Sequence, residues 1–325
     1  MSTFGFYYML TMTTLRRLYT TDAPLTVTGV LMAAALVPAV AGLWLDPRVI
    51  TGAPAWLKPA KFAVSTAIYT LTLAWIFTYL PDWVRTRRIV GRGSAAILIF
   101  EVGAIYLQAW RGTTSHFNVA TPFDAALFTT MGLAIVIQTV GAAIIAVALW
   151  RQRFPDAALG WALRLGLTLS IAGASTGGLM TAPRASQIAE ARATHHMAVS
   201  GAHTVGAPDG GPGLPGTGWS RQHGDIRVAH FVGLHAMQVL PVVAWLLTRR
   251  RKSDARALRL TFVAAGSYFA LFALLLVQAL SGESAVAPSP AFVTAFALWA
   301  LTTGIGTAVA MRRQAAPSSR MVVIA

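Results

Sequence analysis

Blocks of apolar residues alternate with short polar segments along the whole chain. A helix needs roughly 20 apolar residues to cross a hydrocarbon core about 30 Å thick. Eight blocks approach or reach that length, and the fourth is long enough to require a tilted or extended helix. The pattern therefore predicts transmembrane helices near residues 24–44, 60–80, 93–110, 123–150, 157–180, 226–248, 257–281 and 291–311.

Composition supports this prediction, because only 11% of the 325 residues are charged whereas 55% are hydrophobic. A soluble domain carries about a quarter charged residues, so this chain lacks the polar residues needed to cover a water-exposed surface. We expect an all-α fold, a polytopic transmembrane helix bundle that forms one domain over residues 1–325 in contact with the lipid bilayer. The absence of cysteine excludes disulfides, cysteine-ligated metals and thiol catalysis.

The Lys and Arg residues are distributed unequally between the two sides of the predicted membrane. Eighteen of the 26 fall on the side that includes both termini, and 8 fall on the other. Since cytoplasmic loops are enriched in Lys and Arg, both termini are expected in the cytoplasm. The formal net charge of +15 is thereby explained as a topology signal, and nucleic acid is not expected as a partner.

The longest connection, residues 181–225, falls on the outer, periplasmic side and is rich in Gly, Pro and His. Its glycine-rich run 206–218 reads GAPDGGPGLPGTG. Loops this long without secondary structure are usually functional or disordered. We interpret its histidines His195, His196 and His203 as solvated loop residues.

The third predicted span contains a stripe of polar residues. Such residues are costly in lipid, and we treat them as candidate site residues. Glu101 lies near the middle of the span, and Gln108 lies within about 20° of the same direction on a helix. Arg111 ends the span at the outer surface. The stripe is either part of a binding site or a structural hydrogen bond between two helices.

The sixth predicted span carries His230, His235 and Gln238, spread over about 140° of the helix circumference. Histidines five positions apart are poorly spaced for one small metal ion, so one would be a ligand while the other bonds a neighbouring helix. We expect these groups to meet Glu101 inside the bundle, in the outer half of the membrane. The alternative is hydrogen bonding between helices alone.

His116, in the connection between the third and fourth spans, adds a histidine on the same outer side. Histidine is the side chain best suited to bind transition metals or haem, or to transfer protons near neutral pH. The candidate metal ligands are the histidines of this set, and the candidate cofactor-binding residues are His230, His235, His116, Glu101, Gln238 and Gln108.

Four cations border this region on the outer side: Lys58 and Lys61 at the start of the second span, together with Arg111 and Arg227. They would form a basic rim suited to an anionic group such as a haem propionate, a lipid phosphate or a carboxylated substrate. The alternative is that the lysines extend to the lipid headgroups.

Four strings in the chain carry a resemblance to a known family. They are WLKPAKF at 56–62, SHFN at 115–118, GAPDGGPGLP at 206–215 and HGDIRVAHFVGLHAMQVLP at 223–241. They resemble strings of a family of uncharacterised bacterial multi-pass inner-membrane proteins. The resemblance runs from the second predicted helix to the sixth. It implies the bacterial inner (cytoplasmic) membrane and carries over no known activity.

These residues leave four functions open. The first is binding of haem or a divalent transition metal near the outer leaflet, with a redox or electron-transfer role. A proton-coupled transporter of small solutes would instead use Glu101 as its proton site. A membrane-embedded hydrolase of lipid or phosphate substrates would use His116 or His230 as acid–base group. A structural subunit would have other membrane subunits, or further copies of this chain, as partners.

Overall fold

The structure is a computed structural model that describes residues 13–248 and 255–312. A short helix at 13–21 precedes the long helices. These are α2 (Ala23–Leu45), α3 (Leu57–Phe77), α4 (Val84–Arg111), α5 (Pro122–Arg151), α6 (Ala157–Thr181), α8 (Ile226–Leu234), α9 (Ala236–Thr248), α10 (Ala255–Leu280) and α11 (Pro290–Met311). The short elements are β1 (Val49–Ile50), β2 (Ala53–Pro54), α7 (Ala185–Thr194), β3 (Thr204–Val205) and β4 (Gly224–Asp225).

The predicted all-α polytopic bundle is confirmed. Seven of the described helices are long and apolar enough to cross a membrane, and α8 with α9, bent by 45° at their junction, brings the number of candidate spans to eight when the pair is taken as one. Large apolar side chains such as Ile137 and Leu298 are exposed on the outside of these helices, as expected of surfaces that face lipid. The chain is therefore a multi-pass membrane protein.

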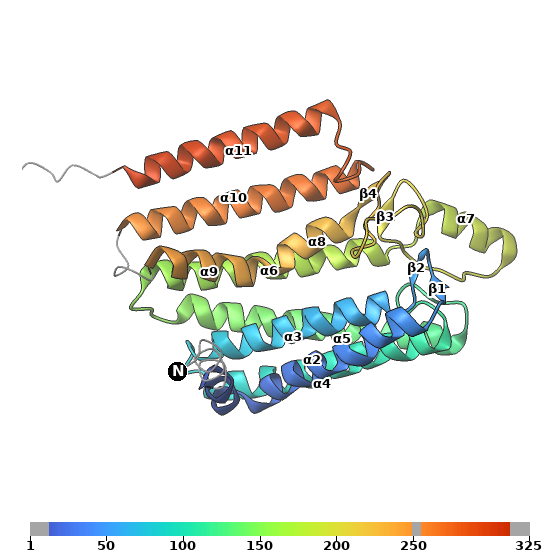
Figure 1. The fold of residues 1–325 in the computed structure, drawn as a ribbon, viewed down its shortest axis with the longest axis horizontal. Helices are drawn as coiled ribbons and strands as arrows, with labels where there is room; N and C mark the ends of the chain where they lie inside the picture. The colour runs from blue at the N-terminus through green and yellow to red at the C-terminus, as the bar shows by residue number, and fades with distance from the viewer. Residues whose placement is uncertain (1–12, 249–254, 313–325) are drawn as a thin grey trace, which may run out of the picture.

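The long helices run side by side, while α7 and the two short antiparallel strand pairs gather at one end of the bundle (Figure 1). We call this the loop end. The short helix at 13–21 and the last turn of α11 lie at the opposite, terminal end (Figure 1). An even number of spans places them there together.

The helices pack as two groups. The first is formed by α2, α3, α4 and α5, and the second by α6, α8, α9 and α10, with α5 against α6 joining them. In the described chain α11 packs on α10 at the edge of the bundle (Figure 1), and Ala310 is its one buried residue. Many polar residues gather at the loop end of the first group, where α3 and α4 meet the long connection.

The bend between α8 and α9 is stabilised by side chains of neighbouring helices. Helix α6 approaches so closely that a Cβ added to Gly173 would lie 2.4 Å from the carbonyl carbon of Gly233. Two backbone carbonyls beside the bend accept hydrogen bonds from hydroxyl groups, one from Ser170 on α6 (2.8 Å) and one from Tyr268 on α10 (2.6 Å). Lipid supplies no hydrogen-bond donors, so these two hydroxyl groups provide partners for carbonyls beside the point where the helix is interrupted.

The connection 181–225 folds into a cap over the loop end. It contains α7 and the antiparallel pair β3–β4, with Thr204 opposite Asp225. Bridges at Asn118–Val199 and Gly213–Ser220 add further pairing. The cap is anchored to the bundle because the Lys61 Nζ donates to the carbonyl of Thr217 at 2.7 Å. The Gly- and Pro-rich run is therefore ordered, and it forms part of the wall of a cavity at this end of the bundle.

Candidate functional site

A cavity of about 990 Å³ lies at the loop end, between the starts of α3 and α8, the end of α4 and the cap. Part of its wall is apolar and comes from residues such as Leu57, Phe62 and Ile105. The remainder carries charge or imidazole groups. These polar lining residues are Lys58, Lys61, Arg184, Arg227, Glu190, Asp209, His116, His196 and His203.

Lys58 lies in the first turn of α3 and lines the cavity. Within the described residues its ammonium makes no hydrogen bond and no ion pair, and its Nζ lies 5.9 Å from the ring centroid of Phe62. Lys61 and Arg227 are its cationic neighbours, and Asp209 is an acidic one. Lys58 therefore presents to the cavity an amino group that has no hydrogen-bond or ion-pair partner among the described residues.

The other lining cations bind parts of the protein. Besides the Lys61 bond to the cap, Arg227 holds the carboxylate of Asp225 with Nε (2.9 Å) and Nη2 (2.6 Å), and its Nη2 also donates to the Gly218 carbonyl at 2.7 Å. Arg184 donates to the Ala202 carbonyl at 2.9 Å. These three cations stabilise the cap, and a ligand would have to compete with their bonds to the protein.

His203 and Asp209 form a pair on the cap side of the cavity. The carboxylate accepts from the His203 Nδ1 at 2.6 Å and from the backbone N–H groups of His203 and Thr204. Burial lowers the pKa of His203, although the bond to Asp209 opposes that effect. Burial alone would raise the pKa of Asp209, but these hydrogen bonds outweigh it and lower the pKa. A neutral imidazole thus donates to a carboxylate, and its Nε2 stays free of Asp209.

His116 lies beside this pair among aromatic rings. Its ring centroid is 5.8 Å from that of Phe62 and 6.4 Å from that of Phe128, and its Nδ1 lies 3.1 Å from the Ser115 Oγ. Burial, and then the nearby charge of Lys58, hold the pKa of His116 well below 6.5. The cavity therefore offers two neutral imidazoles next to one unpaired ammonium.

Gln108 and Arg111 form a separate cluster with Asp124, in the first turn of α5. Gln108 Nε2 donates to the Asp124 carboxylate at 2.8 Å, and Arg111 donates to both Gln108 and Asp124. Thr121 also donates to Asp124, at 2.7 Å. Every charge here has a partner, and Arg111 does not line the cavity. The cluster joins α4 to α5.

Glu101 lies two turns deeper in α4 than Gln108. It is 3% exposed, and its Oε1 has no hydrogen-bond partner among the described residues. Ile105, one turn closer to the loop end on the same face of α4, lines the cavity. Glu101 is thus a buried carboxyl group just below the cavity.

The sixth-span candidates bond neighbouring helices. His230 Nδ1 lies 2.9 Å from the Gly173 carbonyl of α6, and the Gln238 amide donates to Thr72 of α3 at 3.3 Å. His235, at the bend, lies against Phe231 with ring centroids 4.3 Å apart. Helix α8 packs against α6 and α10, whereas α4 packs against α2, α3 and α5.

The structure therefore groups the candidates differently from the expectation that the third and sixth spans share one site. No hydrogen bond or ion pair among the described residues joins the α4 candidates to those of α8 and α9. The part of the chain that is described contains no group of three or more His, Asp or Glu positioned to hold a metal ion. The cavity brings together Lys58, Lys61, Arg227 and His116 of the predicted residues.

Sequence reasoning interpreted His203 as a solvated loop residue and did not select Asp209. They are six residues apart, and the glycines and prolines between and after them allow the chain to turn back so that the carboxylate reaches the His203 backbone. The spacing of a carboxylate from a histidine within a Gly-rich turn is the signal that would have identified them.

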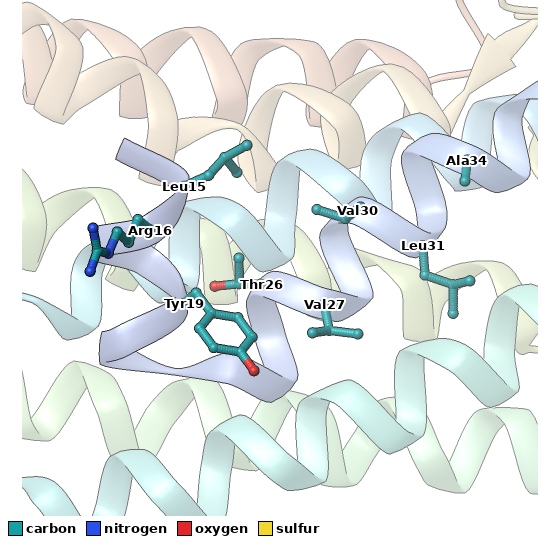
Figure 2. Close-up of a pocket in the computed structure, with 8 residues that line it drawn as sticks. All are labelled: Leu15, Arg16, Tyr19, Thr26, Val27, Val30, Leu31 and Ala34. Atoms are coloured by element: carbon teal, nitrogen blue, oxygen red, sulfur yellow. The ribbon is translucent and has the colours of Figure 1, made fainter. Parts of the chain in front are cut away.

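A second depression, of about 610 Å³, lies between the short helix at 13–21 and α2 (Figure 2). Figure 2 shows that its wall is formed largely by aliphatic side chains such as Val27, Val30 and Leu31, with Arg16 and Tyr19 at one edge. It contains none of the candidate residues. We assign it to the lipid-facing surface, and the loop-end cavity is the candidate site.

Comparison of the chain with protein-family models, with curated proteins and with solved structures finds no match. The resemblance described above therefore stays an expectation. The function has to be inferred from the cavity itself.

Proposed function

We propose that this protein binds a small amphiphilic monoanion, such as a carboxylate with an apolar tail, in the loop-end cavity. The observation that carries the proposal is the Lys58 ammonium, which lines the cavity and has no partner in the described chain. The Lys and Arg bias of the loops supports an outer location for this end, and the family resemblance supports a bacterial inner membrane. The ligand would thus enter from the periplasm.

The positive charge of the cavity indicates a negatively charged ligand. An ammonium that lies near Lys61 and Arg227 is stabilised by an anion, and a charge-assisted hydrogen bond is about twice as strong as a neutral one. One unpaired ammonium matches one negative charge. The neighbouring imidazoles of His116 and His203 would donate to, or accept from, the remaining polar atoms of the ligand.

The apolar body of the ligand follows from the cavity wall. Leu57, Phe62 and Ile105 line the side next to the bundle, and the volume is within the range of small-molecule sites, about 300–1,000 Å³. A purely hydrophilic ion such as inorganic phosphate would leave this wall in contact with water. A short-chain carboxylate fills both parts of the cavity.

Haem is the second candidate, because His116 and His203 line the same cavity as Lys58 and Lys61. A neutral imidazole is the usual axial ligand of haem iron, and the lysines would meet its propionates. An absorption spectrum and elemental analysis of the purified protein separate the two candidates. A Soret band, or metal in stoichiometric amount, would favour haem and refute the carboxylate proposal.

The carboxylate proposal is tested by calorimetric titration of the detergent-purified chain with octanoate. Lys58→Gln is compared with Arg192→Gln, which removes an exposed cation from α7 that does not line the cavity. We expect saturable binding by the wild type and by Arg192→Gln, and a loss of at least about tenfold in affinity for Lys58→Gln. A wild type that does not bind octanoate would refute the proposal.

A further inference from the structure

Glu101 is the one carboxyl group in the interior of a described span, since Asp124 lies in the first turn of α5. It is almost completely buried and its Oε1 has no partner in the described residues. A buried carboxylate without hydrogen bonds or a counter-ion is strongly unfavourable. Its presence therefore requires a nearby cation or a proton.

The nearby cation is Lys58. The helices packed against α4 present apolar groups to the stretch around Glu101, with Met32 from α2 and Met131 from α5. From α3, Lys58 is the charged group that acts on Glu101. Phe62, one turn along α3 from Lys58, packs between Val102 and Ile105 of α4, which brings the two helices together at this level.

Lys58 therefore serves two sites. Its charge acts on Glu101 inside the bundle, and the same ammonium lines the cavity in which the ligand is proposed to bind. The two residues are not within ion-pair distance of each other in the described structure, so Lys58 is not committed to Glu101. A ligand carboxylate that binds Lys58 adds a second negative charge beside the first.

Two carboxylates that share one cation away from water do not both stay ionised, and one of them takes up a proton. We infer that binding of a carboxylate in the loop-end cavity is coupled to protonation of Glu101, so that the protein takes up the anion together with one proton. This inference rests on the proposed function. The coupled step adds one negative and one positive charge, and the site therefore gains no net charge.

Other titratable groups face the cavity and would also respond to pH. His116 comes from the loop after α4, His203 and Asp209 from the cap, Lys58 and Lys61 from α3, and Arg227 from α8. A pH profile of the wild type alone would not separate them from Glu101. The test therefore combines a proton count with a substitution of Glu101.

The experiment is calorimetric titration of the full chain in detergent with octanoate, in two buffers of different ionisation enthalpy and at three pH values. We expect the wild type to take up about one proton per octanoate, so that affinity falls by about tenfold for each unit of rising pH. In Glu101→Gln, which mimics the protonated side chain, proton uptake disappears and binding at high pH stays as strong as at low pH. Asp82→Asn removes an exposed acid from the connection between α3 and α4 that does not line the cavity, and it should behave like the wild type.

The outcomes distinguish this inference from the proposed function. Octanoate binding without proton uptake in the wild type overturns the coupling and leaves the binding site in place. Unchanged proton uptake in Glu101→Gln overturns the role of Glu101. No octanoate binding at any pH overturns both. If Glu101→Gln does not fold, Glu101→Asp retains the carboxyl group, and we expect it to keep the uptake of one proton with a displaced pH midpoint.

Discussion

Two cations at the loop end, Arg111 and Lys58, lie in opposite circumstances although both were predicted to belong to one basic rim. Arg111 donates to Gln108 and Asp124 and closes a cluster in which every charge is paired. Lys58 has no such partner in the described chain and lines the cavity. The paired cation joins two helices, whereas the unpaired one is available to a ligand.

The difference arises from the neighbouring helix. Asp124 lies in the first turn of α5, where Thr121 orients it toward the end of α4. At the start of α3, the acids whose charges act on Lys58 are Asp209, which is bonded to His203, and the buried Glu101. The comparison teaches that the neighbouring helix ends decide whether a cation at this end of the bundle is paired.

The largest loss of stability is expected when the cluster of Gln108, Arg111 and Asp124 is broken. Asp124→Ala leaves Arg111 without its counter-ion and removes the acceptor of the Gln108 amide, so the free energy of unfolding should fall by about 3 kcal/mol. Unfolding in detergent followed by circular dichroism measures this. Glu190→Ala, an exposed acid at the same end, is the control and should change stability by less than about 0.5 kcal/mol. Equal effects of the two substitutions would show that the cluster contributes no stability.

Acidification sharpens the comparison, because it adds positive charge next to Lys58 but not next to Arg111. The pKa values of His116 and His203 lie below 6.5 in the folded protein. Protonation below that pH therefore favours the unfolded state, and the stability present above about pH 6.5 is lost as the pH falls. We expect the melting temperature to decrease from about pH 8 to about pH 5, and to decrease less in His116→Gln. A melting temperature that rises on acidification would contradict the assigned direction.

A smaller loss of stability is expected when Lys61, the cation that anchors the cap, is replaced. Lys61→Met removes the hydrogen bond to the Thr217 carbonyl, which contributes about 1 kcal/mol. Hydrogen exchange in the run 206–218 should become faster by about fivefold, while exchange in α10 stays unchanged. Unaltered exchange in that run would mean that the cap is held without Lys61.

The smallest effect on stability is expected at Lys58 itself. Lys58→Met removes an unpaired charge and breaks no hydrogen bond, so the free energy of unfolding should stay within about 0.5 kcal/mol of the wild type or rise. Octanoate binding should nevertheless be lost. A destabilisation as large as that of Lys61→Met would show that Lys58 has a structural partner, and the contrast with Arg111 would disappear.

The spans could be predicted closely, but the arrangement of the site could not. The fourth apolar block was expected at 123–150, and α5 runs from Pro122 to Arg151. The sixth block was expected to be one helix, yet it bends at His235, where Ser170 and Tyr268 bond the carbonyls beside the bend. Those donors come from other helices, and no pattern within the block reports them.

The sequence by itself determined that this chain is a bundle of eight apolar spans, because each helix in lipid has to satisfy its backbone polar groups internally and hydropathy is a local property. The tertiary structure alone decided that Arg111 is paired and Lys58 is not, and that His203 and His116 line one cavity beneath an ordered cap. The physical reason is that charge pairing and cavity walls depend on which helix ends are neighbours, and side chains distant in the chain meet only after the helices have packed.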